Sequence, residues 1–146
     1  MGKFIEYVKL VRLPGWGAYC VTAIFGALSV GVFDPLTITI LFGIGAFITL
    51  YGFVLNDYID ISTDNLSKDL TDRPLVKGSI PRHHALYISV FALIMAYVII
   101  FAAMYFDIFL HNINMLIVFT IAVICAAIYN IFGKKFAGSD TFVQEL

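Results

Sequence analysis

Four stretches of 21 or 22 residues contain no Asp, Glu, Lys or Arg, and this feature limits the possible folds most. At about 1.5 Å of rise per residue, a helix of that length crosses a hydrocarbon core of roughly 30 Å. The chain is 61% hydrophobic and only 13% charged, as expected when a bilayer is the solvent. We therefore predict an all-α, polytopic transmembrane helical bundle with four spans, at about residues 13–33, 35–57, 84–106 and 112–133.

The positions of the basic residues predict the orientation of these spans. All nine Lys and Arg lie before the first span, between the second and third, or after the fourth. We therefore predict a multi-pass protein of the cytoplasmic membrane. By the positive-inside rule, its N-terminus and its 56–84 connection face the cytoplasm. The net charge is −1 and no basic patch is interleaved with aromatics, which excludes a nucleic-acid partner. Residues 1–12 alternate apolar and charged side chains at helical spacing, as in a helix on the membrane surface.

An acidic motif opens the connection between the second and third spans, and it consists of Asn56, Asp57, Asp60 and Asp64. If the second helix continues past Leu55, these side chains fall within an arc of about 100° on one face. Oxygen ligands on one face suit a hard cation such as Mg²⁺. The glycine and closing glutamate of an EF-hand loop are absent. The spacing predicts a magnesium site, with an ordinary solvated loop as the alternative.

Three basic side chains follow in the same connection, Lys68, Arg73 and Lys77. The whole connection of residues 56–84 is long for a link between packed helices, which indicates a functional loop. Arginine and lysine are the usual partners of phosphate oxygens. Together with the acidic motif they would hold a metal-bound diphosphate from two sides.

Three segments of the chain resemble the UbiA superfamily of intramembrane prenyltransferases. The acidic motif is similar to the first aspartate-rich motif of that superfamily, and residues 72–80 are similar to its Arg-Pro-Leu-x-x-Gly-x-Ile segment. Residues 129–135 resemble the tyrosine-containing end of its fourth span, with the basic residues that follow. These segments occur in the order and between the spans that the superfamily has. The resemblance covers nearly the whole chain.

The resemblance implies transfer of a prenyl group from a polyprenyl diphosphate to a hydrophobic or aromatic acceptor. Departure of diphosphate develops negative charge that a metal and fixed cations stabilise, and it leaves a carbocation that needs a dry cavity. Asp60 and Asp64 would be the catalytic residues. The acceptor stays open among an aromatic acid, a glycerophosphate lipid precursor and a haem-type ring. Mg²⁺ would be bound by Asn56, Asp57, Asp60 and Asp64, and diphosphate by Lys68, Arg73, Lys77, Tyr129, Lys134 and Lys135, although Tyr129 also suits ordinary packing.

The chain also departs from the superfamily pattern. Its members have about twice as many spans and a second aspartate-rich motif, whereas this sequence stops at Leu146. We therefore expect residues 1–146 to be the N-terminal part of an eight- or nine-span enzyme. The missing C-terminal half would be its partner, and the chain alone would be inactive.

Two other functional classes compete with a prenyltransferase. A CDP-alcohol phosphotransferase-like enzyme also binds metal and diphosphate at a membrane surface, but it requires an Asp-Gly pair that is absent after Asp60. A non-enzymatic cation-binding membrane or transport subunit would carry charged residues inside its spans, and these spans have none. Cys20 and Cys125 lie within spans and suit apolar packing rather than metal binding.

Overall fold

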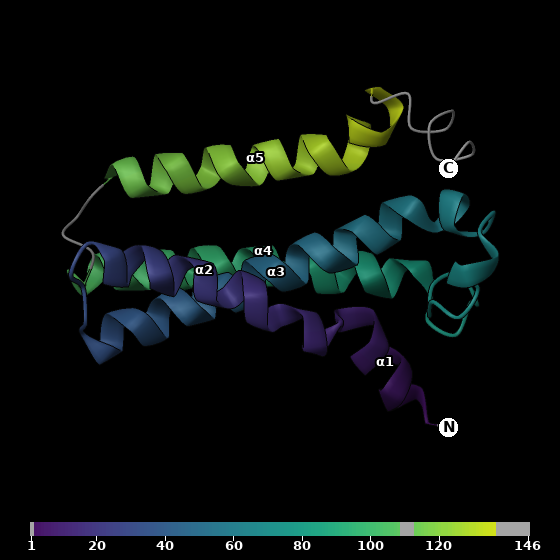
Figure 1. Ribbon diagram of the computed structural model, residues 1–146, viewed down its shortest axis with the longest axis horizontal. Coiled ribbons are helices and arrows are strands. Elements are labelled where there is room, and N and C mark those ends of the chain that lie inside the picture. The colour runs from purple at the N-terminus through teal and green to yellow at the C-terminus, as the bar shows by residue number, and fades with distance from the viewer. Residues whose placement is uncertain (1, 109–112, 137–146) are drawn as a thin grey trace. The chain divides into compact units, whose positions relative to one another are not determined.

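The computed structural model describes residues 2–108 and 113–136, and its regular elements are all helices in this part of the chain. This confirms the predicted all-α class. The chain divides into two compact units, residues 1–112 and residues 113–146, which are described separately. The elements are α1 (Lys3–Val11), η1 (Leu13–Gly15), α2 (Trp16–Ser29), α3 (Pro35–Asp64), η2 (Lys68–Leu70), α4 (Arg82–Tyr105) and α5 (Ile113–Phe136), and Figure 1 labels the α-helices among them.

Helix α3 is the central element of the first unit, and it packs against both α2 and α4. Asp34 caps its start, because its Oδ2 accepts hydrogen bonds from the backbone N–H and the hydroxyl of Thr37, at 2.7 and 2.8 Å. The 30 residues of α3 span about 45 Å, more than a hydrocarbon core of roughly 30 Å. The helix therefore reaches beyond the apolar layer.

The extension of α3 corrects the predicted bounds of the 56–84 loop. Residues 56–64 are the last turns of α3, and residues 82–84 already belong to α4. Only residues 65–81 connect the two helices, and they include the short η2 helix. The acidic motif thus lies on a helix. The prediction that its side chains share one face required the second helix to continue past Leu55, and α3 does continue past it.

The first apolar stretch also differs from the prediction of a span over 13–33. Its α-helix, α2, has 14 residues, or about 21 Å, because a 3₁₀ turn containing Pro14 precedes it and Gly31, at φ 82°, follows it. Among the described residues, three helical segments are long and apolar enough to cross a membrane: Pro35–Asp64, Arg82–Tyr105 and Ile113–Phe132.

Small side chains allow the helices of the first unit to approach closely. A Cβ atom added to Gly45 of α3 would lie 3.2 Å from the Cα of Cys20 in α2. On the other side, α4 turns a row of buried small side chains inward, and the Ser89 hydroxyl among them donates to the backbone oxygen of Tyr51 at 3.3 Å. Such close contacts are typical of helices packed within a membrane. The other buried small residues of α4 are Ala85, Ala92, Ala96 and Ala103.

A cluster of apolar side chains closes the end of this unit where the acidic motif lies. Leu10 of α1 and Val54 of α3 are fully buried in it, together with Ala85 of α4. Leu75 and Ile80 from the α3–α4 connection complete the cluster. The cluster therefore holds α1 and the connection against the two long helices.

Candidate functional site

Three carboxylates lie on one buried face of the last turns of α3. Asp57, Asp60 and Asp64 are only 4%, 3% and 5% exposed, and their spacing of three and four residues keeps them on one side of the helix. Asn56, the fourth member of the acidic motif, is partly exposed beside them. Buried carboxylates require compensating charge or hydrogen bonds, so the neighbours of this face decide its chemistry.

Arg73 from the α3–α4 connection bridges two of these carboxylates. Its Nη1 atom lies 3.3 Å from Oδ1 of Asp57 and also donates to Oδ2 of Asp64. The Arg73 side chain is 27% exposed and lines an open pocket. An arginine at this position can therefore pair with the carboxylates and also meet an anion that arrives from outside.

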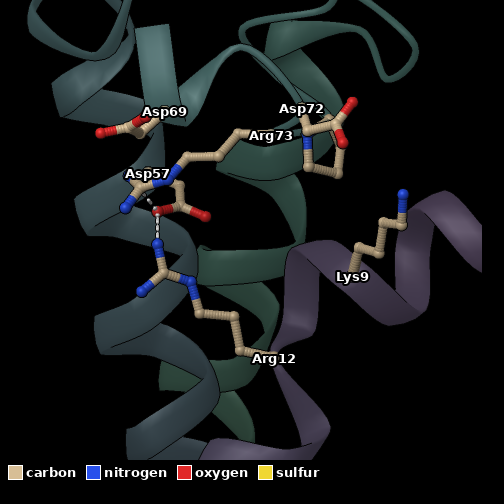
Figure 2. A pocket seen from close by; sticks show the side chains of 7 residues that line it. Lys9, Arg12, Asp57, Asp69, Asp72 and Arg73 are labelled. Carbon is tan, nitrogen blue, oxygen red and sulfur yellow. Dashed lines mark hydrogen bonds and ion pairs between the residues drawn. The ribbon is translucent and has the colours of Figure 1, made fainter. Parts of the chain in front are cut away.

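Arg12 approaches the same face from the N-terminal segment. It ends α1 in the left-handed conformation, at φ 50°, and its Nη2 donates to Oδ1 of Asp57. Figure 2 shows Arg12 and Arg73 reaching Asp57 from opposite sides. The sequence pattern indicates Arg12 only as one of the basic residues before the first span. Its role was missed because the two partners are 45 residues apart and no local motif joins them.

These side chains line an open pocket of about 280 Å³, seen from close by in Figure 2. Both signs of charge face it, so the pocket can accept an anion together with a cation. Lys9 comes from α1 and Arg12 directly follows that helix, whereas Asp57 comes from α3. The lining from the connection consists of Asp69, Asp72, Arg73 and Pro74.

Of the other predicted diphosphate-binding residues, Lys68 and Lys77 belong to the first unit and do not line this pocket. Lys77 directs its ammonium group to Glu6 of α1, at 3.3 Å, and Lys68 is an exposed residue of η2. Tyr129 is exposed on α5, in the second unit. Lys134 and Lys135 also belong to α5, but their side chains lie outside the described part of the chain. Their predicted roles stay predictions.

The donor chemistry of the acidic motif fits magnesium, although the carboxylates are arranged around an arginine. Among the described residues, no group of three or more His, Cys, Asp or Glu side chains is placed to hold a metal ion. The physical reason is that Asp57 and Asp64 both turn to the Arg73 guanidinium, which supplies positive charge between them. One amide and three carboxylates on a rigid helix remain a suitable oxygen donor set for a hard cation.

Comparison with known proteins identifies the family. The sequence profile described as the UbiA prenyltransferase family matches residues 18–144. A curated relative, digeranylgeranylglyceryl phosphate synthase of Methanocaldococcus jannaschii, is 32% identical over 109 residues, which cover 68% of this chain and 36% of the relative. The chain thus spans about a third of the length of that relative. No solved structure matches the chain. The matched segment includes α3 with its acidic motif and the connection with Arg73, and the chain therefore belongs to the UbiA prenyltransferase family.

Proposed function

We propose that this protein binds the diphosphate of a polyprenyl diphosphate through Mg²⁺ and takes part in transfer of the prenyl group to an acceptor. The observation that carries the proposal is the buried carboxylate face of α3 beside a pocket lined by arginines. Membership of a prenyltransferase family supports the reaction class. The geometry of the pocket supports the proposed position of the diphosphate, beside the carboxylate face of α3.

The acidic motif and the two arginines have separate roles in this proposal. Asn56, Asp57, Asp60 and Asp64 hold Mg²⁺, which when bound neutralises charge on the phosphate oxygens. Arg73 turns its exposed side to the diphosphate and stabilises the negative charge that develops as the allylic C–O bond breaks. Arg12 keeps Asp57 oriented toward the pocket. Lys68, Lys77, Tyr129, Lys134 and Lys135 remain further candidate contacts for the diphosphate, from segments around this pocket and from α5.

The relative bears on the acceptor. Its name describes a synthase of digeranylgeranylglyceryl phosphate. Of the acceptors that the sequence left open, a glycerophosphate lipid precursor is therefore the one that we propose, rather than an aromatic acid or a haem-type ring. Because the chain spans 36% of that relative, we also propose that complete transfer needs further segments beyond those matched here.

The orientation in the membrane is part of the proposal. We place the N-terminus and the α3–α4 connection on the cytoplasmic side, because the basic residues of the first unit gather at that end. Ser67→Cys, made in a variant whose Cys20 and Cys125 are replaced by alanine, would test this by labelling with an impermeant maleimide. Labelling from the cytoplasmic side only is expected, and labelling from the opposite side only would refute it.

Ligand-dependent stability tests the diphosphate site. The purified protein in detergent is heated with Mg²⁺, with geranylgeranyl diphosphate, and with both. A shift of the melting temperature that requires both ligands is expected, because each completes the binding site of the other. Stabilisation by Mg²⁺ alone, unchanged by the diphosphate, would favour the cation-binding subunit instead.

Asp60→Asn and Asp34→Asn provide a matched pair for this assay. Both change an aspartate of α3 or its cap to the isosteric amide, but Asp34 lies at the opposite end of the helix from the motif. Asp60→Asn should abolish the joint effect of the two ligands. Asp34→Asn should retain it, since asparagine also caps a helix. Equal loss in both variants would contradict the proposed site.

A further inference from the structure

Helix α1 also makes polar contact with the α3–α4 connection, outside the pocket. The Glu6 carboxylate contacts two residues of the connection: Oε1 lies 3.3 Å from Nζ of Lys77, and Oε2 accepts from the hydroxyl of Ser79 at 2.8 Å. Oε1 also lies 3.7 Å from Nζ of Lys9 within α1 itself. The Glu6 side chain is only 12% exposed. A carboxylate that is largely buried and doubly paired is held in one place. The Ser79 hydrogen bond is the main cause that lowers the pKa of Glu6 below its ordinary value.

The residues that Glu6 contacts belong to one hydrogen-bonded turn that also carries Arg73. Within this turn, the backbone N–H of Lys77 donates to the oxygen of Arg73 at 2.9 Å, and the N–H of Ser79 donates to the oxygen of Pro74 at 3.0 Å. The Ser79 hydroxyl lies 3.1 Å from the same Pro74 oxygen. We call residues 73–79 the arginine turn. Its two ends cannot move independently, because these hydrogen bonds close it on itself.

The arginine turn is therefore fastened at both ends, to different helices. At one end Arg73 pairs with Asp57 and Asp64 of α3, and at the other Lys77 and Ser79 meet α1. Helix α1 is itself anchored, because Leu10 is fully buried. The hydroxyl of Tyr7 lies 2.6 Å from Nδ1 of His84 in α4, which adds a polar anchor. Because α1 is fixed, its contacts with Lys77 and Ser79 can hold the turn in place.

We propose that α1 is a clamp on the arginine turn, and that Glu6 is a positioning residue for Arg73 in the diphosphate site. The inference rests on the proposed function for the identity of the ligand, but the clamp itself rests only on the contacts above. The family profile begins at residue 18, so α1 lies outside the matched segment. In this reading Lys77 serves the clamp instead of contacting the diphosphate.

Charge reversal across the Glu6–Lys77 pair tests the clamp. Glu6→Lys and Lys77→Glu each place like charges together and should release the turn, whereas the double variant restores opposite charges. Hydrogen exchange of the backbone amides of residues 73–80 reports the clamp without any ligand. The affinity for geranylgeranyl diphosphate in the presence of Mg²⁺ reports whether Arg73 is held in the position that binds the diphosphate. Ser79→Ala, compared with Ser29→Ala at the distant end of α2, supplies a matched control for the hydroxyl contact.

Each single reversal should raise exchange about tenfold and weaken diphosphate affinity about fivefold. The double variant should restore part of both, because it rebuilds the ion pair but offers no carboxylate at position 6 to the Ser79 hydroxyl and places a lysine beside Lys9. Unchanged exchange in the single variants would refute the clamp. Restored exchange without restored affinity would refute the positioning role, because Lys77 would then contact the diphosphate itself. Absence of Mg²⁺-dependent binding in wild type would refute the proposed function and the positioning role, while the exchange data would still decide whether the clamp exists.

Discussion

Removal of the Arg73 side chain is the most direct test of how the acidic face is held. Arg73→Ala leaves Asp64 without this partner and Asp57 with Arg12 as its remaining arginine. Breaking a buried ion pair by deleting one member costs about 3–5 kcal/mol, whereas fully exposed pairs contribute about 0–1 kcal/mol. The Arg73 side chain is 27% exposed and the side chains of Asp57 and Asp64, taken alone, are 5% and 6% exposed, which places this site between the two cases. We expect a loss of about 2 kcal/mol.

A loss of that size is measurable by thermal unfolding in detergent. For a chain of this length it corresponds to a fall of about 4–8 °C in the melting temperature. Arg82→Ala is the matched control, because Arg82 lies over the ring of Tyr58 at 4.5 Å and such a contact contributes only about 0.5–1 kcal/mol. A fall for Arg73→Ala no larger than that for Arg82→Ala would refute the reasoning.

A double-mutant cycle separates the ion pair from other effects of the substitution. Asp64→Asn removes the charge that Arg73→Ala would leave buried, so the double variant should be more stable than the sum of the two single losses predicts. We expect a coupling energy of about 1–2 kcal/mol between the two positions. Strict additivity would show that the Arg73–Asp64 contact does not contribute to stability.

The remaining predictions concern helix packing and capping. Gly45→Ala should lower stability by about 1–3 kcal/mol, because the new Cβ would lie 3.2 Å from the Cα of Cys20. Gly52→Ala, where nothing lies within 4 Å, should instead raise it by about 0.5–1 kcal/mol, and thermal unfolding of both variants checks the contrast. The Thr37 backbone hydrogen bond lowers the pKa of Asp34 below its ordinary value of 3.8, so its capping stabilises the fold above that pH and is lost as the pH falls through the lowered value. The destabilisation caused by Asp34→Ala should therefore shrink in unfolding curves recorded below pH 3.8, and a constant difference would contradict this.

The ends of the elements were harder to predict than the elements themselves. The uncharged stretches predicted the helices, but not that α3 would continue through the acidic motif to Asp64 or that α2 would be limited to Trp16–Ser29. Polar side chains do not stop a helix whose backbone hydrogen bonds are already formed. A proline turn and a glycine at positive φ do limit one, and their effect depends on the local backbone. The bounds of the first span and of the 56–84 loop were wrong for these reasons.

By itself, the sequence determined the class of the fold, the family motifs and the shared face of Asp57, Asp60 and Asp64, because these follow from composition and from the period of a helix. Only the tertiary structure decided which basic side chains contact that face. Arg12 reaches Asp57 across 45 residues and Lys77 reaches Glu6 across 71, and no local pattern encodes such pairs. They form because Leu10, Val54, Leu75, Ile80 and Ala85 bury one another and thereby bring α1 and the arginine turn to the end of α3.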